Sequence, residues 1–202
     1  MKNKKILFLV VVIIIILIFG FFIFKSMTKN KKYGNNMNSQ EIVDYILNIN
    51  SYKAKITVNV SSNKNNNKYV IKQEYSKENG SMQEVIEPSN IAGTKITNKD
   101  GNLIVENTNL NLSTIFENYK GLGENDLDLS LFIEECKLSN NYRSEEINGQ
   151  IIIENKINNG NKYRGNKKLY IDKEKLIPNK LIIEDYNQNT TINIEYNEIE
   201  LN

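Results

Sequence analysis

Two motifs near the middle of the chain contain residue types that can bind ligands. Gly121-Leu122-Gly123 carries the first two glycines of a dinucleotide fingerprint, but Asp126 stands where the third glycine belongs. The fingerprint works because its glycines let the strand-to-helix turn of a βαβ unit approach a pyrophosphate closely. No βαβ unit is predicted around these residues, so we expect no nucleotide site there.

The second motif has the spacing of the start of a calcium-binding loop. Asp126, Asp128 and Ser130 alternate as the first ligands of such a loop do. Leu131, however, takes the place of the required glycine, and Lys137 takes that of the bidentate glutamate. We therefore interpret the two aspartates as carboxylates on the surface of a helix and expect no metal site.

The other reactive side chains form no catalytic pattern. Glu134-Glu135 and Glu145-Glu146 are adjacent acids, which point in different directions on a helix or a strand, so we expect them to be solvated. Cys136 ends an apolar helical stretch and has no basic neighbour on its expected face, which favours a buried structural thiol over a nucleophile. With no His and one Cys, the chain excludes Ser-His-Asp and Cys-His relays, a histidine-bearing zinc site and an internal disulfide. We expect a protein that is not an enzyme, with no catalytic, cofactor-binding or metal-binding residues.

Charge is distributed unevenly along the 202 residues. Seven of the 26 basic residues precede Glu41, the first acid, which leaves 19 basic residues against 24 acids, a net charge of about −5 for the remainder. Affinity for nucleic acid comes mainly from clustered lysines and arginines. An acidic domain of this kind is therefore not expected to bind nucleic acid.

The N-terminus has the properties of a membrane anchor. Residues 6–24 form an uninterrupted apolar run, which as a helix rising about 1.5 Å per residue just spans a hydrocarbon core of about 30 Å. Lysines flank the run, and no small-residue cleavage site or lipidation cysteine follows it. We predict a single transmembrane helix within residues 1–25 and a basic juxtamembrane linker over 26–37, with a cleaved signal peptide as the alternative. The charges on the two sides of the span are nearly balanced and do not determine its orientation. A short amino-terminal tail most simply remains in the cytoplasm while the domain is exported, so we expect an extracytoplasmic domain.

The remaining residues, 38–202, are predicted to form one domain that opens with a helix. Over residues 38–49, Ile42, Val43, Ile46 and Leu47 fall on one stripe at helical spacing. Asn38 is a suitable N-cap, and the acid at position 41 completes a capping box. The apolar stripe has the width needed to lie on a sheet.

After this helix the apolar period changes to two, which predicts strands. The expected strands are residues 52–60, 68–75, 81–86, 93–98, 102–107, 142–147, 150–157, 168–172, 180–185 and 190–198. Four connections contain steps that favour tight hairpin turns: Asn79-Gly80, Asp100-Gly101, Asn148-Gly149 and Asn159-Gly160. An antiparallel meander follows from these turns.

Alternation fails between residues 110 and 138, where a second helix is expected to start near Asn125. The predicted class is α+β: a curved antiparallel sheet, an incomplete β-barrel, with helices in its hollow. Five tyrosines fall on expected strands, namely Tyr52, Tyr69, Tyr75, Tyr170 and Tyr196, and Tyr163 lies between two of them. We expect them to fill the core, with the alternative that some line an apolar cavity in the hollow.

Several stretches together resemble a known family. They are residues 51–54 (Ser-Tyr-Lys-Ala) after the first helix, residues 88–93 (Pro-Ser-Asn-Ile-Ala-Gly), and residues 177–185 followed by 190–202. They are similar to the LolA/LolB-type lipoprotein carrier fold, an incomplete antiparallel barrel around helices. Residues 110–119 and 127–135 are in addition similar to the clostridial spore-germination lipoproteins of the GerS type. The resemblance covers nearly all of residues 38–202.

This resemblance implies a non-enzymatic binding protein of the cell envelope that acts in sporulation or germination. Its implied partner is a cell-wall (spore cortex) N-acetylmuramoyl-L-alanine amidase, which would carry the zinc and the catalysis. The alternative is a carrier or sensor of a lipid or lipoprotein acyl chain, bound in the hollow of the half-barrel. The chain departs from the GerS pattern in having a membrane helix where those proteins have a lipidated cysteine, and no site residues carry over.

Overall fold

A computed structural model describes residues 37–61, 65–118, 126–139, 142–157 and 164–202. These residues form eleven strands and two helices. The helices are α2 (Ser39–Leu47) and α3 (Leu129–Ser139). The strands are β1 (Ser51–Ser61), β2 (Asn66–Ser76), β3 (Gly80–Glu87), β4 (Lys95–Lys99), β5 (Asn102–Asn107), β6 (Leu112–Phe116), β7 (Arg143–Ile147), β8 (Gln150–Lys156), β9 (Asn166–Asp172), β10 (Ile177–Glu184) and β11 (Thr190–Leu201).

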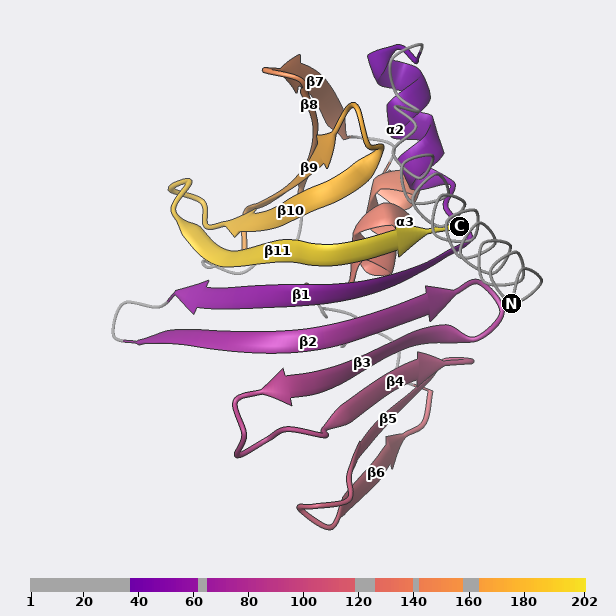
Figure 1. Ribbon diagram of the computed structural model, residues 1–202, viewed down its shortest axis with the longest axis vertical. Helices are drawn as coiled ribbons and strands as arrows, with labels where there is room; N and C mark the ends of the chain where they lie inside the picture. The colour runs from indigo at the N-terminus through magenta and orange to yellow at the C-terminus, as the bar shows by residue number, and fades with distance from the viewer. Residues whose placement is uncertain (1–36, 62–64, 119–125, 140–141, 158–163) are drawn as a thin grey trace, which may run out of the picture. The chain divides into compact units, whose positions relative to one another are not determined.

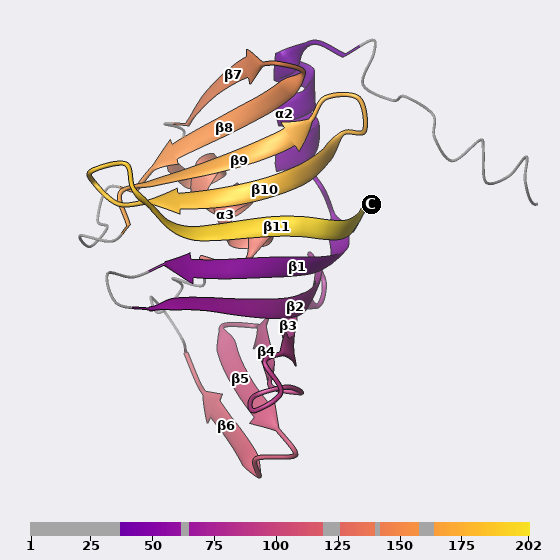
Figure 2. The same ribbon diagram turned by 60° about the vertical axis from the view of Figure 1, so that its left-hand side comes forward.

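All eleven strands belong to one antiparallel sheet. Their order is β6-β5-β4-β3-β2-β1-β11-β10-β9-β8-β7, so two meanders meet where β1 pairs with β11 (Figures 1 and 2). Strand β1 alternates as predicted, with Tyr52, Ala54, Ile56 and Val58 buried on one face. The curved antiparallel sheet with helices on one face confirms the expected α+β class.

Hairpin turns follow the predicted signals closely. Both residues of the Asp100-Gly101 and Asn148-Gly149 steps have positive φ, which is the backbone of a type I′ turn. At the Asn79-Gly80 turn Gly80 has positive φ. A Cβ at Gly80 would collide with the carbonyl oxygen of Asn98, so this position also requires glycine for space. The fourth step, Asn159-Gly160, lies outside the described residues, as does Tyr163.

Helix α2 begins with the predicted capping box. The Glu41 amide donates to the Asn38 side-chain oxygen at 3.0 Å, and the Asn38 amide donates to the Glu41 carboxylate at 2.8 Å. The apolar stripe of α2, Ile42, Val43, Ile46 and Leu47, is fully buried. This helix therefore contributes one complete apolar face to the core.

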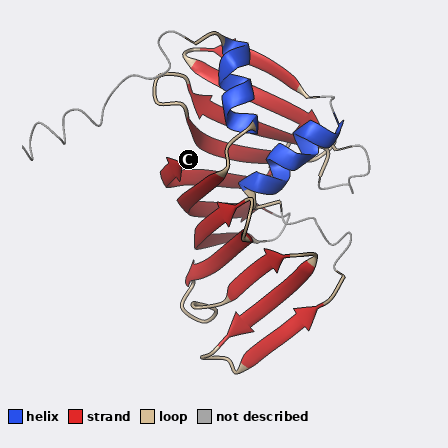
Figure 3. Ribbon diagram, turned by 90° about the vertical axis from the view of Figure 1, so that its right-hand side faces the viewer, coloured by secondary structure: helices blue, strands red, loops and turns tan. Residues whose placement is uncertain are grey.

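Helix α3 lies on the same face of the sheet as α2 (Figure 3). Its buried residues are Leu129, Phe132, Ile133 and Cys136, and they join α2 and the inward-facing residues of β1, β2 and β8 to β11 in one core cluster. The expected start of this helix near Asn125 is wrong, because the regular turn begins at Leu129 after two buried aspartates.

The N-terminal prediction concerns residues beyond the described part of the chain. The transmembrane helix expected within residues 1–25 and most of the linker expected over 26–37 lie outside the described residues. Among the residues that the structure describes, no helix has the length and apolar character needed to cross a membrane.

Candidate interaction surface

The hollow of the sheet is occupied by side chains of the two helices. Phe132 of α3 is 1% exposed and packs in the same cluster as Ile42 of α2, Ile151 of β8 and Ile171 of β9. Of the tyrosines expected in the core, the five that the structure describes lie on strands as predicted. Tyr52 and Tyr196 are buried against this cluster, and the other three are half-buried. A carrier of acyl chains needs apolar space inside the hollow, and α3 fills the hollow over β8 to β11 and β1.

A buried aspartate fixes the start of α3 to the sheet. Asp128 is 2% exposed, and its Oδ1 accepts a hydrogen bond from the Tyr52 hydroxyl at 2.8 Å. The same oxygen accepts from the Ser130 amide at 2.9 Å and from the Ser130 hydroxyl at 2.7 Å, which caps the first turn of the helix. Burial, and next the neighbouring Asp128 carboxylate, raise the pKa of Tyr52 well above its usual value. The Tyr52 hydroxyl is thus held as a neutral donor.

A second buried aspartate anchors the segment before α3 by charge. Asp126 pairs with Lys167 of β9 at 2.9 Å and with the guanidinium of Arg164. Lys167 also contacts Glu135 of α3, with its Nζ 2.7 Å from a carboxylate oxygen, and is 1% exposed. The prediction that Asp126 and Asp128 are helix-surface carboxylates is therefore wrong: both are buried and both attach α3 to the strands.

The adjacent acids have separate roles. Glu134 is exposed as expected, whereas Glu135 is drawn into the ion cluster with Lys167. Glu145 is exposed on β7, and Glu146 accepts from Ser39 at 2.7 Å and from Lys173 at 2.6 Å. These two bonds lower the pKa of Glu146. Neither pair places two carboxylates side by side, as acid catalysis by paired acids requires.

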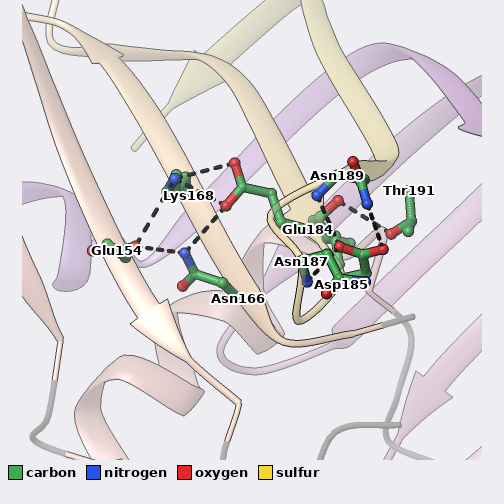
Figure 4. A network of polar contacts seen from close by, with 9 residues as sticks. Glu154, Asn166, Lys168, Glu184, Asp185, Asn187, Asn189 and Thr191 are labelled. Atoms are coloured by element: carbon green, nitrogen blue, oxygen red, sulfur yellow. Dashed lines mark hydrogen bonds and ion pairs between the residues drawn. The ribbon is translucent and has the colours of Figure 1, made fainter. Parts of the chain in front are cut away.

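On the opposite face of the sheet, polar contacts join β8, β9 and β10 (Figure 4). Asn166 donates to Glu154 at 2.5 Å, and the Lys168 ammonium lies 2.9 Å from Glu184. The hydrogen bond to Glu184 raises the pKa of Lys168. Because an ammonium neutralises the converging acids, this network is suited to holding strands together rather than to proton transfer.

The same view shows how the β10–β11 turn is closed. The Asp185 carboxylate accepts from the amides of Asn187 and Asn189, each at 2.8 Å, and these bonds together with that from the Asn189 side chain lower its pKa. Over the described residues, no group of three or more acidic or thiol side chains is arranged to hold a metal ion.

One cavity of about 410 Å³ lies at the ends of β1, β2 and β3. Its lining includes Tyr52 and Tyr75, whose ring centroids are 5.6 Å apart, together with Met82 and the exposed ion pair of Lys53 and Glu74. The cavity is bordered by charged and backbone polar groups as well as by the two rings, so it is not the apolar chamber an acyl chain would need.

The exposed apolar residues concentrate at one edge of the sheet. Eight large apolar side chains are exposed in the described residues, and four of them lie in or directly before β6: Leu110, Leu112, Ile115 and Phe116, at 53%, 40%, 59% and 45%. We call these four residues the β6 surface. A cluster of apolar groups at a sheet edge is typical of a protein-binding site.

The two edges of the sheet differ in how they are protected. Strand β7, at the other edge, is fully exposed but carries Arg143, Glu145 and Glu146 among its five residues. Charged residues on an edge strand oppose pairing with another chain. Strand β6 has the sequence Leu-Ser-Thr-Ile-Phe and no charge. Of the two edges in the described sheet, the β6 edge is therefore the one that is chemically open to a further strand.

The half of the sheet next to this edge has no helix of the described residues against it (Figure 3). Residues that pair directly across antiparallel strands lie on the same face of the sheet. From β1 to β6, the successive partners on the helix-covered face are Ala54, Gln73, Gln83, Ile96, Val105 and Thr114. Leu103 and Val105 of β5 lie on this face beside Phe116 and Thr114 and are only half-buried. The apolar surface thus continues from the edge onto the face.

A groove borders the β6 surface at one end. It has a volume of about 340 Å³ and is lined in part by Lys95, Glu106, Asn107 and Leu112. Asn107, which is 1% exposed, donates to the Ala92 carbonyl at 3.2 Å and to the Thr94 hydroxyl at 2.7 Å, and so holds the β3–β4 connection in place. The groove wall is therefore rigidly supported.

Sequence reasoning missed the β6 surface because the expected break of alternation began at residue 110. The alternation of Leu112, Thr114 and Phe116 on one face is the only local signal, and it spans five residues. Its exposure is a property of the tertiary structure, in which α2 and α3 lie over the other half of the sheet (Figure 3).

Comparison with known proteins identifies the family. The profile described as "Sporulation protein YdcC-like" matches residues 3–202. The chain therefore belongs to the YdcC-like sporulation proteins. No curated protein matches it.

Among solved structures, the chain is similar to one from Clostridioides difficile of the CwlD amidase in complex with the GerS lipoprotein. The likeness to GerS has a TM-score of 0.52 at 23% identity and covers 80% of this chain and 92% of that one. An uncharacterised conserved protein from Thermus thermophilus gives a TM-score of 0.52 at 11% identity, covering 82% and 88%. A LolA superfamily protein from Nitrosomonas europaea gives a TM-score of 0.42 at 13% identity, covering 82% and 94%. The likeness to GerS confirms the expected resemblance, and at 23% identity it is the fold that is shared.

Proposed function

We propose that this chain is a membrane-anchored, non-enzymatic binding protein of the cell envelope that recruits or regulates a spore cortex amidase during sporulation. The single observation that carries the proposal is the uncharged, apolar β6 surface at the edge of a sheet whose hollow is filled over β8 to β11 and β1. Such a surface is suited to a protein partner, whereas the buried polar groups serve to hold α3.

The family and the shared fold support the class of partner. The family is one of sporulation proteins, and GerS is a lipoprotein found in complex with the CwlD amidase. An amidase would itself supply the zinc and the catalytic groups. The chain has no histidine with which to supply them.

The anchor completes the proposal. Residues 1–25 would hold the protein in the membrane by one span, residues 26–37 would form the basic linker, and residues 38–202 would lie on the extracytoplasmic side, within reach of a cell-wall amidase. In this arrangement the membrane helix replaces the lipid by which a lipoprotein is attached.

The test is binding between the full chain in detergent and the purified CwlD-type amidase of the same organism, followed by light scattering and by mass spectrometry of extracted lipids. We expect a stoichiometric complex without bound lipid. A chain that carries lipid in a fixed ratio and forms no complex with the amidase would overturn the proposal and would favour the carrier of acyl chains.

A further inference from the structure

The exposed part of the β6 surface is apolar on both sides of the strand. Leu112 and Phe116 point to the helix-covered face, because they pair with Asn107 and Leu103, and Ile115 points to the opposite face. All three are at least 40% exposed. A helix docked on the sheet would cover one of these faces only, whereas a strand placed beside β6 contacts both.

The backbone of β6 favours the same kind of occupant. Strand β6 pairs with β5 on one side, and within the described residues it is the last strand of the sheet. An added strand would place alternate side chains against Leu112 on one face of β6 and Ile115 on the other. Its own residues at these contacts must be uncharged, since a charge set against apolar side chains would lose its hydration without a partner.

A second copy of this chain is a poor occupant. Two antiparallel β6 strands would pair five residues on each side, which buries far less than the about 800 Å² per partner of a stable interface. A two-fold axis at this pairing would also continue the sheet in its own plane and leave the half-buried Leu103 and Val105 uncovered in both copies. A different, larger protein can add a strand and also cover this face.

We infer that the β6 edge is the docking site for the amidase and that an uncharged, apolar edge strand of the amidase adds to the sheet beside β6. This inference rests on the proposed function and specifies its interface. The groove formed by Lys95, Glu106 and Leu112 lies at the end of that edge and would receive a side chain from the end of the added strand.

The test compares two lysine substitutions on opposite edges of the sheet. Ile115→Lys places a charge in the proposed interface, and Ile147→Lys places the same charge on β7, where the native side chain is 44% exposed against 59% for Ile115. Both sites are exposed, so both variants are expected to fold, as circular dichroism and thermal unfolding would verify. Leu112→Lys is a second interface variant on the other face of β6.

We expect Ile115→Lys and Leu112→Lys to weaken amidase binding about tenfold or more, as for residues central to an interface, and Ile147→Lys to leave it unchanged. Hydrogen exchange should slow at the β6 amides in the complex and remain unchanged at β7. Equal binding by wild type and Ile115→Lys, or unchanged β6 exchange in a formed complex, would refute the strand addition while leaving the proposed function intact.

Two further outcomes are distinguishable. If the wild-type chain alone forms a dimer that Ile115→Lys abolishes, and amidase binding survives, the edge belongs to a second copy and the inference is wrong. If the wild-type chain forms no complex with the amidase at all, the proposed function itself fails, and the inference fails with it.

Discussion

Two buried tyrosines on neighbouring strands allow a matched test of how α3 is held. The Tyr52 hydroxyl donates to Asp128 at 2.8 Å, whereas the Tyr196 hydroxyl is buried and has no hydrogen-bond partner among the described residues. The two side chains are 1% and 8% exposed. Replacing either one by phenylalanine removes the same single oxygen.

The expected costs differ because a hydrogen bond to a buried charge is lost at only one site. Tyr52→Phe leaves the Asp128 carboxylate with Ser130 as its remaining partner, and we expect it to lower the free energy of unfolding by about 2 kcal/mol. For a domain of this size that corresponds to a fall in Tm of about 5 °C. Tyr196→Phe removes a hydroxyl that gains nothing from burial, so we expect no loss of stability or a small gain.

Urea unfolding, followed by circular dichroism and by tyrosine fluorescence, measures the stability of both variants. Tyrosine fluorescence can be used because the chain has no tryptophan. Equal destabilisation by the two substitutions would refute the reasoning, because it would mean that the hydrogen bond to Asp128 adds nothing to the effect of removing a buried hydroxyl. A double variant with Asp128→Asn should show less than additive loss for Tyr52→Phe.

The same pair predicts the alkaline limit of stability. Burial raises the pKa of Tyr52 and of Tyr196 in the folded state, with the Asp128 carboxylate adding to both. A folded pKa above the unfolded value of about 10 means that the folded state holds the proton more tightly. The stabilisation is therefore complete below pH 10 and is lost as the pH rises further. Above pH 10 the stability of Tyr52→Phe should fall less steeply with pH than that of the wild type. Urea midpoints measured over a series of pH values would show this.

Three further predictions concern single contacts. Lys167→Met should destabilise by about 3 kcal/mol, because it removes the buried ammonium between Asp126 and Glu135 while Arg164 stays paired with Asp126. Differential scanning calorimetry should show no such loss for the more exposed Lys168→Met, and equal losses would contradict the buried ion cluster. Burial raises the pKa of Cys136 to about 12, so its thiol should react with iodoacetamide at pH 8 only at the rate of unfolding, and fast labelling of the folded protein would contradict its burial. Gly80→Ala should lose about 2 kcal/mol, since its Cβ meets the Asn98 carbonyl oxygen; a Tm equal to that of the wild type would mean that the turn relaxes freely.

Local signals predicted much of this fold. The capping box at Asn38, the alternation of β1 and the type I′ turn at Asp100-Gly101 depend on residues close together in the sequence, and each is present as expected. The antiparallel class follows from such turns alone. Sequence order also leaves β1 and β11 at opposite ends of the domain, yet they pair at the centre of the sheet, and the strand pattern by itself did not predict this.

The site could not be predicted in the same way. Asp126 and Asp128 have the composition of surface residues, and their burial depends on Lys167 and Tyr52, which lie 41 and 76 positions away in the sequence. The exposure of the β6 surface depends on where the helices lie, and the packing of the whole domain determines the position of the helices. A five-residue uncharged strand gives too weak a period to be recognised alone.

The central claim, that this chain binds a spore cortex amidase through the β6 edge, is tested most directly by isothermal titration of the purified CwlD-type amidase into the full chain in detergent, repeated with Ile115→Lys and Ile147→Lys. The account predicts saturable binding of one amidase per chain, weakened about tenfold or more by Ile115→Lys and unchanged by Ile147→Lys. Absence of binding at amidase concentrations of about 100 μM, or equal affinities for all three chains, would contradict it.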